Sequence, residues 1–345
     1  MKILVTGATG LIGCHAAAAL REAGHSVRLL VRDASRLDAV FAPFGLSGAD
    51  FDVAVGALED EGALDEALLG CTGLLHCAGR FSPDRRDAAV LRKTNVEGTR
   101  RVLEAAERVR GDAGLERAVY VSSILALFPA PGPKMRASDE VASPAEMYAA
   151  TKADAERVAR AAQSRLPLTI VYPAAVQGPD DPTFSIGPRL VADALAEGSV
   201  LVTEGGLPST DVRDLARVFV AIFGGAPHAE RLMGPAFYVE HAAYHRLLCD
   251  LTGRDLRAQR MPAWLLRAMG RVGDWMGLLG RPVQLTSEAA AVLTRSVPVD
   301  DDEARRLLGQ PPITAEDAFR DLIAWMVEAG HVPPEAAGRI GPGRT

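Results

Sequence analysis

The sequence predicts an α/β protein built on a doubly wound parallel sheet, with a smaller and mostly helical C-terminal lobe. First, a glycine-rich turn joins an N-terminal apolar segment to an Ala-rich one. Second, strand-like and helix-like segments alternate along the first half of the chain, as parallel βαβ units require. Third, Gly and Pro become dense after residue 173, and the rest of the chain has mainly helical patterning. We expect ligands to lie between the two lobes, at the carboxyl ends of the strands.

The glycine-rich turn is the most informative feature. Residues 3–5 are predicted to form a buried strand, residues 14–23 a helix, and Gly7, Gly10 and Gly13 lie between them. This arrangement is typical of a Rossmann-type dinucleotide site. Gly7 would allow the tight turn, Gly10 would let the backbone approach a pyrophosphate, and Gly13 would let the helix pack on the strand. The helix N-terminus would offer free N–H groups to the phosphates.

The alternating pattern predicts the remaining elements. Further strands are expected at residues 26–31, 51–55, 73–76, 118–122, 168–172 and 236–240. Helices are expected at 62–69, 87–109, 145–165, 188–196 and 212–223, the last of them returning to the first lobe. We therefore assign residues 1–173 plus about 209–240 to the dinucleotide-binding Rossmann lobe. About 174–208 plus 241–330 form the substrate-binding lobe, and 331–345 a flexible tail.

Composition excludes several classes of protein. The chain has 345 residues, 48% hydrophobic and 24% charged, with a net charge of −6, so we expect no nucleic acid partner. The four cysteines lack the spacing of a metal site or a disulfide framework, which predicts reduced thiols in a reducing compartment. His241 and His245 have no third ligand nearby in the sequence, so no metal is expected.

The remaining sequence signals favour a cytoplasmic protein. The first predicted strand begins at residue 2, which leaves no room for a signal peptide. No apolar run approaches the roughly 20 residues of a membrane helix, so no membrane partner is expected. We expect the helix at 264–279 to pack over the substrate pocket as a lid, with contact to a membrane surface as the open alternative.

Three residues carry the predicted chemistry. Tyr148 and Lys152 lie four apart in a predicted helix, so their side chains share a face. A nearby ammonium would favour the phenolate and lower the pKa of Tyr148 from its ordinary value near 10. Ser123 ends the fifth strand, where its hydroxyl could orient a substrate oxygen. Ser122 is the competing choice, because successive strand residues face opposite ways.

Several motifs together resemble the extended short-chain dehydrogenase/reductase family, which is the NAD-dependent epimerase/dehydratase superfamily. They are Thr6-Gly-Ala-Thr-Gly-Leu-Ile-Gly13, Asn95-Val-Glu-Gly-Thr99, Ser122-Ser123, Tyr148-Ala-Ala-Thr-Lys152, Pro173-Ala-Ala-Val-Gln-Gly-Pro179 and Asp211-Val-Arg-Asp-Leu-Ala216. The resemblance covers about residues 1–330 and is strongest to the branch of dihydroflavonol 4-reductases and 3β-hydroxysteroid dehydrogenases.

The resemblance implies a role for each motif. Tyr148 would be the acid/base, Lys152 would hold the cofactor ribose, Ser123 would polarise the substrate oxygen, and Asn95 would support the lysine through water. A homodimer through the helices at 87–109 and 145–165 is also implied. The cofactor-binding residues would be Gly7, Thr9, Gly10, Leu11, Ile12, Arg32, Arg36, Leu58, Cys77, Ala78, Gly79, Lys152, Pro173 and Val176.

The end of the second strand bears on the choice of cofactor. Arg32 and the nearby Arg36 could pair with a 2′-phosphate, which favours NADP(H). Asp33 could instead take a ribose 2′-hydroxyl, so NAD(H) stays open. Many relatives carry an Asp that meets adenine where this chain has Ala57, so Leu58 would hold the adenine through its backbone.

Three functions are compatible with these motifs. The first is an NADP(H)-dependent oxidoreductase acting on a carbonyl or alcohol of a hydrophobic molecule, with Phe81, Ile124 and Phe184 lining the substrate pocket. The second is a nucleotide-sugar epimerase or dehydratase. Those enzymes usually carry an Asn where this chain has Ala175, and Arg189 and Arg213 would be the remaining candidates to bind a diphosphate. The third is a non-catalytic NADP-binding regulatory or assembly protein.

Overall fold

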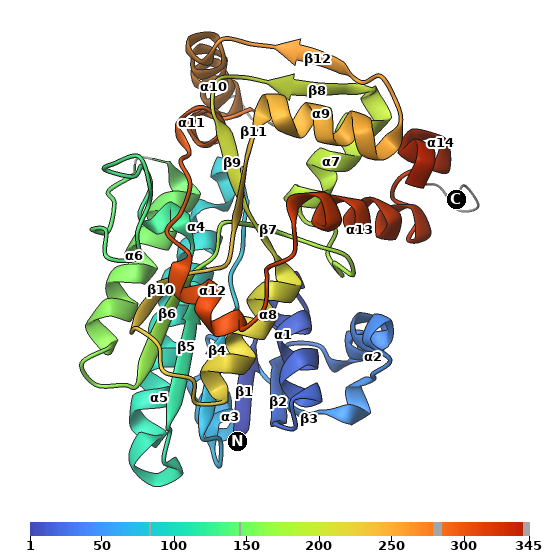
Figure 1. Ribbon diagram of the computed structural model, residues 1–345. Helices are drawn as coiled ribbons and strands as arrows, with labels where there is room; N and C mark the ends of the chain where they lie inside the picture. The colour runs from blue at the N-terminus through green and yellow to red at the C-terminus, as the bar shows by residue number, and fades with distance from the viewer. Residues whose placement is uncertain (83, 145, 279–284, 341–345) are drawn as a thin grey trace.

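The fold is built on a seven-stranded, all-parallel sheet (Figure 1). The computed structural model describes residues 1–345 except 83, 145, 279–284 and 341–345. Its strands, in spatial order, are β10 (Arg231–Met233), β6 (Leu168–Tyr172), β5 (Arg117–Val121), β4 (Gly73–His76), β1 (Lys2–Thr6), β2 (Ser26–Val31) and β3 (Asp52–Val55). Every neighbouring pair is parallel. The chain winds outward in both directions from β1 and β4, so the strand order reverses between them, which is where an open α/β sheet binds its ligands.

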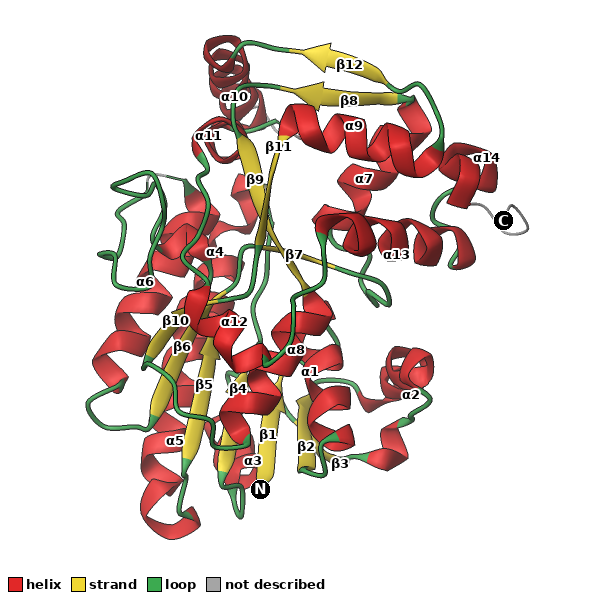
Figure 2. Cartoon of the chain, in the orientation of Figure 1, coloured by secondary structure: helices red, strands yellow, loops and turns green. Residues whose placement is uncertain are grey.

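Helices cover both faces of this sheet (Figure 2). One face packs against α1 (Leu11–Glu22), α2 (Leu37–Phe41) and α8 (Val212–Phe223), and the other against α3 (Glu61–Leu68), α5 (Thr99–Ala113) and α6 (Met147–Ala162). In β1, Ile3 and Val5 belong to the first core and Leu4 to the second. Because both faces of the sheet are covered, β1, β4, β5 and β6 are buried over almost their whole length, which includes the predicted buried segment 3–5.

The C-terminal half carries two small sheets as well as helices. One sheet has the order β11 (Phe237–Glu240), β9 (Gly206–Asp211), β7 (Ala175–Gln177), and the other pairs β12 (Arg257–Arg260) with β8 (Ser199–Val202). The helices are α7 (Ile186–Glu197), α9 (His241–Thr252), α10 (Ala263–Leu278), α11 (Ser287–Arg295), α12 (Asp302–Leu308), α13 (Ala315–Glu328) and α14 (Pro334–Ala337). These elements gather beyond the carboxyl ends of the main strands, except α12, which packs against α8 (Figure 1).

Several expectations about this half need correction. The strand expected at 236–240 is β11, but it pairs with β9 in a small sheet, and β10 takes the edge position beside β6. Residues 331–340 are not a flexible tail, because Val332, Ala336 and Ala337 are buried in the C-terminal core. The rest of the predicted tail, 341–345, lies outside the described residues. The exact lobe boundaries stay a prediction.

The predicted lid helix corresponds to α10, which buries Ala263 and Leu266 but leaves other apolar residues in solvent. Trp264 and Trp275 are 66% and 62% exposed, and Val272 is 56% exposed. The helix instead packs on α11 through Gly270, where an added Cβ would lie 2.8 Å from the Thr286 carbonyl oxygen. The lid role of the helix at 264–279 and its alternative, contact with a membrane surface, stay predictions: the described part of this helix lies against α11 with its tryptophans in solvent.

The predicted helix at 87–109 is divided. It consists of α4 (Ala88–Leu91), a π-helical segment over Arg92–Gly98, and α5. A π-helical turn inside an α-helix commonly marks a functional site. Here it contains Asn95, one of the predicted site residues.

Candidate functional site

In the glycine-rich turn, two of the three glycines lie so close to neighbouring backbone that a side chain would not fit. Gly7 has φ +75°, and a Cβ on it would lie 2.7 Å from the backbone nitrogen of Ala78. A Cβ on Gly13 would collide with the carbonyl oxygen of Gly7. Gly10 differs, because the nearest atom to its Cβ position is the Gly7 carbonyl oxygen at 3.6 Å. Gly7 and Gly13 are thus required by internal packing, whereas Gly10 leaves space for a ligand.

The N-terminus of α1 fits an anionic group. Gly10 is its N-cap, and within the described part of the chain no side chain hydrogen-bonds to this helix end and its first turn has no acidic residue. The N–H groups of Leu11, Ile12 and Gly13 in the first helical turn have no intrahelical acceptor by construction. Together with the helix dipole they suit a pyrophosphate, with Thr9 in the preceding turn. The residues present therefore fit a dinucleotide.

The ends of β1 and β4 are tied together beside this turn. Cys77 donates its N–H to the Thr6 carbonyl at 3.2 Å, and Ala78 donates to the Thr6 hydroxyl at 3.3 Å. The Asn95 amide oxygen lies 3.6 Å from the Cβ position of Gly79. Residues 77–79, predicted to bind the cofactor, thus line the point where the strand order reverses.

The charged residues after β2 lie in solvent. Arg32 and Arg36 are both exposed. Asp33 caps the following turn, where its Oδ1 accepts hydrogen bonds from the Ser35 N–H at 2.9 Å and the Ser35 hydroxyl at 2.7 Å. These bonds lower the pKa of Asp33 below its ordinary value. The carboxylate is thus engaged locally, while both guanidinium groups lie in solvent.

Three other predicted cofactor residues lie near the carboxyl ends of the strands. Leu58 packs on the π-helical segment, with its Cδ1 3.0 Å from the Cβ position of Gly98. The Pro173 carbonyl accepts the Ile124 N–H at 3.1 Å. Val176 lies in β7, paired with Thr210 of β9.

Tyr148 and Lys152 project from the first two turns of α6. The Lys152 side chain is buried, donates to the carbonyl oxygen of Val121 at 3.3 Å and lies 5.5 Å from the ring centroid of Tyr120. Burial lowers the pKa of Lys152 to about 8, although Glu156 acts in the opposite direction. The lysine is thus held against the end of β5, beside Ser122 and Ser123.

The pKa of Tyr148 moves in the direction opposite to the sequence prediction. Burial raises it above its ordinary value, and the negative charge of Glu288 adds to the effect. Burial disfavours the charged phenolate more than Lys152, which is directed at the Val121 carbonyl, favours it. The prediction that Lys152 lowers this pKa is therefore wrong for the structure, and Tyr148 is a protonated phenol at neutral pH.

The two serines after β5 have different surroundings. Ser122 is buried and donates to Glu156 at 2.7 Å, and Glu156 also accepts hydrogen bonds from Tyr172 and Arg160. Ser123 is partly exposed and its Oγ accepts the Leu125 N–H at 3.2 Å. Since a hydroxyl can still donate its own proton, Ser123 is the serine with a donor to offer a ligand.

Asn95 joins the loop after β4 to the tyrosine helix. Its Oδ1 accepts the Arg80 N–H at 2.8 Å, and its Nδ2 donates to the Arg80 carbonyl at 2.9 Å and to the Thr151 hydroxyl at 3.1 Å. Thr151 immediately precedes Lys152. Asn95 therefore joins the Arg80 backbone to the Thr151 side chain next to Lys152, and its support of the lysine through water stays a prediction.

The three predicted substrate-pocket residues lie in two different parts of the fold. Phe81 packs edge-on against Tyr148, with ring centroids 4.9 Å apart. Ile124 follows Ser123, but its side chain is buried in the core. Phe184 stacks on His331 at 3.9 Å and contacts Trp325 of α13. Phe184 is therefore a packing residue of the C-terminal helices, and its assignment to the pocket is corrected.

Sequence reasoning did not identify Glu288 as a site residue. Its Oε1 accepts the N–H of Ala149 at 3.2 Å, directly beside Tyr148. Burial raises the pKa of Glu288 to about 7. Glu288 lies 140 positions after Tyr148 and in another part of the fold, so no local spacing relates the two residues.

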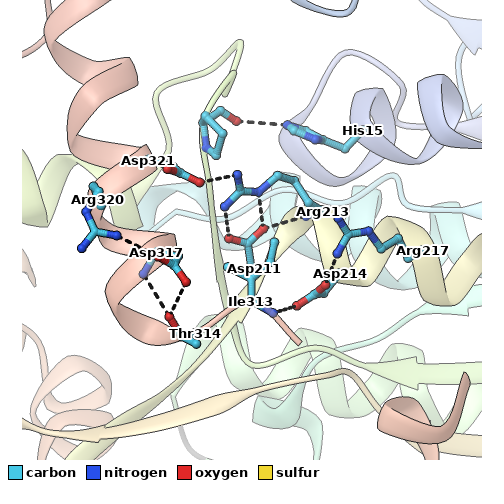
Figure 3. Close-up of polar contacts among 11 residues, drawn as sticks. His15, Asp211, Arg213, Asp214, Arg217, Ile313, Thr314, Asp317, Arg320 and Asp321 are labelled. Carbon is cyan, nitrogen blue, oxygen red and sulfur yellow. Dashed lines mark hydrogen bonds and ion pairs between the residues drawn. The ribbon is translucent and has the colours of Figure 1, made fainter. Parts of the chain in front are cut away.

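The two arginines considered for a sugar diphosphate are engaged within the protein. Arg213 binds Asp211 through two nitrogens, at 2.9 and 2.8 Å, and Asp321 of α13 at 2.6 Å (Figure 3). Asp211 is itself buried. Arg189 donates to the Phe184 carbonyl at 2.6 Å and lies 5.7 Å from the Phe184 ring centroid. Arg213 thus joins α8 to α13, and Arg189 fixes the loop before α7.

Comparison with known proteins gives one family and several full-length relatives. Residues 3–230 match the NAD dependent epimerase/dehydratase family. The chain is 30% identical to "Putative dihydroflavonol 4-reductase" of Synechocystis sp., over 95% of both chains. It is 32% identical to the 4-hydroxy-2-methyl-3-oxo-4-farnesyl-3,4-dihydroquinoline-1-oxide ketoreductase of Stigmatella aurantiaca, over 90% of this chain and 91% of the relative.

The solved structures agree on the fold. The dTDP-glucose 4,6-dehydratase DesIV of Streptomyces venezuelae, solved with NAD and TYD bound, superposes with a TM-score of 0.73 at 22% identity. The match covers 97% of this chain and 99% of DesIV. Within the described residues, no helix has both the length and the apolar character to cross a bilayer.

Proposed function

The chain belongs to the NAD-dependent epimerase/dehydratase family, within the extended short-chain dehydrogenases/reductases, and we propose that it is an NADP(H)-dependent oxidoreductase acting on a hydrophobic small molecule. It would reduce a carbonyl group or oxidise the corresponding alcohol. The proposal joins the family's nicotinamide chemistry to the groups that surround Tyr148.

The main support for this proposal is the aromatic ring of Phe81, which lies beside Tyr148. Phe81 packs on Tyr148 and is 46% exposed, so it offers aromatic surface next to the phenol. A sugar diphosphate would need charge-assisted donors. Arg213 is instead paired with Asp211 and Asp321, and the Nε of the exposed Arg189 donates to the Phe184 carbonyl. The Stigmatella relative, a ketoreductase named for a farnesylated substrate, supports the same substrate class.

The residues divide the chemistry among them. A bound nicotinamide cofactor would supply or accept the hydride. Tyr148, a protonated phenol at neutral pH, donates a proton to the substrate oxygen in reduction. Ser123 donates a hydrogen bond to the same oxygen and stabilises the negative charge that develops there. Lys152 holds the cofactor ribose, and Asn95, which bonds to the Thr151 hydroxyl beside it, supports the lysine through water.

The exposed arginines support a preference for NADP(H). Arg32 and Arg36 lie in solvent after β2, whereas Asp33 is bound to Ser35. A guanidinium suits a 2′-phosphate through paired hydrogen bonds. We further propose a homodimer through the long helices that include α5 and α6, an assembly that rests on family resemblance.

A cofactor titration followed by a substrate panel tests the proposal. NADPH should bind more tightly than NADH, measured by quenching of protein fluorescence. Aromatic ketones, 3-ketosteroids, prenylated quinoline ketones and UDP-sugars are then offered with NADPH. We expect NADPH consumption with a hydrophobic ketone. Conversion of a UDP-sugar to its epimer or dehydration product without net cofactor consumption would instead establish the epimerase/dehydratase alternative.

A further inference from the structure

The tyrosine helix receives a cap from a distant part of the chain. The N-cap residue of α6 is Glu146, and among the described residues its side chain makes no capping bond to the helix. The first-turn N–H of Ala149 is bound by Glu288 of α11, at 3.2 Å. Since α11 packs on α10, this bond joins the C-terminal elements to the turn that carries Tyr148.

We propose that Glu288 is a positioning residue for Tyr148. Glu288 caps the first turn of α6, and its negative charge favours the protonated phenol of Tyr148. Glu288 would thereby raise the pH at which Tyr148 forms the phenolate, which is the base that alcohol oxidation requires. This inference rests on the proposed role of Tyr148 as the proton donor.

The charges around Glu288 determine the sign of the effect. Glu146 before α6 and Asp274 of α10 face Glu288, and both carry negative charge that favours its neutral form. The α6 N–H groups favour the carboxylate. On balance burial dominates and raises the pKa of Glu288 to about 7. As pH rises through this value, Glu288 gains its charge and the phenolate of Tyr148 becomes harder to form.

A matched pair of variants isolates the charge. E288Q keeps an oxygen that accepts the Ala149 N–H but loses the charge, whereas E288A loses both. E146Q removes a charge two residues before Tyr148 and is the control, since Glu288 but not Glu146 contributes to the raised pKa of Tyr148. Each protein is labelled with [¹³Cζ]-tyrosine and titrated by NMR, with Y148F identifying the Tyr148 signal.

We expect the Tyr148 signal to titrate at lower pH in E288Q by about one unit, which is a tenfold change in the ionisation constant. E146Q should match wild type. Amide hydrogen exchange over residues 147–150 should accelerate in E288A and stay near wild type in E288Q. In turnover, the pH at which alcohol oxidation rises should shift downward in E288Q alone.

The outcomes separate this inference from the proposed function. An unchanged Tyr148 titration in E288Q would overturn the positioning role, even if Y148F had lost turnover as the proposed function requires. Full turnover in Y148F would overturn the proposed function, and the NMR titration, which needs no substrate, would still report on Glu288. An equal shift in E146Q would also contradict a specific role for Glu288.

Discussion

The ring of Phe81 packs edge-on against the ring of Tyr148, with centroids 4.9 Å apart and an angle of 82° between the planes. Edge-to-face pairs contribute about 0.5–1.5 kcal/mol beyond the burial of their surface. Phe81 follows β4 and Tyr148 lies in the first turn of α6, which follows β5, so the contact joins segments that come after two neighbouring strands. It places apolar surface next to the proposed proton donor.

Truncating this ring should weaken substrate binding more than chemistry. We expect F81A to raise KM for a hydrophobic ketone about tenfold, equal to roughly 1.4 kcal/mol, because the apolar contact is lost. Binding of NADPH should stay at the wild-type value. Steady-state kinetics would check this, with V90A, at a similarly exposed apolar position, as the control. Unchanged KM in F81A would show that the substrate does not contact this ring.

The glycine turn separates a folding requirement from a binding requirement. G7A should lower the free energy of unfolding by several kcal/mol, because its Cβ meets the Ala78 backbone at φ +75°. G10A should fold normally, because its Cβ would meet no protein atom closer than 3.6 Å. It should bind the cofactor more weakly by tenfold or more, because the Cβ would occupy the space proposed for the pyrophosphate. Urea unfolding and fluorescence titration measure the two effects.

A third glycine provides the control for backbone strain. Gly24 has φ +84° but no atom within 4 Å of its Cβ position, so G24A reports strain without a clash and should cost about 1 kcal/mol. Equal losses of stability in G7A and G24A would contradict the role assigned to the close contact with Ala78. Wild-type cofactor affinity in G10A would argue against a pyrophosphate at the turn.

Arg32 should distinguish the two cofactors. We expect R32A to weaken NADPH binding about 10- to 100-fold and NADH binding little, because only NADPH has a 2′-phosphate for the guanidinium. R36A should act in the same direction. R267A, which removes an exposed arginine on α10, is the control for net charge. Equal losses for both cofactors in R32A would rule out recognition of the 2′-phosphate.

The lowered pKa of Lys152 predicts a pH dependence of cofactor binding. Below about pH 8 the side chain is an ammonium that can donate to ribose hydroxyls, and above it the charge is lost. Affinity for NADPH should therefore fall as pH rises through about 8. Titrations from pH 6.5 to 9.5 would check this against K152M, whose affinity should be lower and flat over that range. A flat profile for the wild type would contradict the assigned role of Lys152.

The local parts of the site could be predicted from sequence because short-range sterics and sheet topology determine them. A turn at Gly7 and Gly10 between strand and helix has few conformations, and parallel strands place their carboxyl ends at one edge. The π-helical segment that contains Asn95 was not predicted, because its apolar pattern matches an α-helix. Ser122 and Ser123 could be separated only once the contact with Glu156 was known.

The long-range parts could not be predicted for a physical reason. Glu288 comes close to Tyr148 only because α11 lies beside the N-terminus of α6. Phe184 stacks on His331, and the sequence pattern did not predict how the C-terminal segments that bring these two rings together pack. Likewise, β10 is three residues long, too short to show a periodic pattern. The raised pKa of Tyr148 follows from burial and a distant carboxylate, neither of which the spacing to Lys152 reveals.

The kinetics of Y148F, measured together with its affinity for NADPH, show whether Tyr148 is the proton donor. Loss of the phenol proton should reduce kcat for the preferred ketone by about 10²–10⁴-fold while NADPH binds as it does to wild type. Full turnover in Y148F, with cofactor binding intact, would show that another group donates the proton.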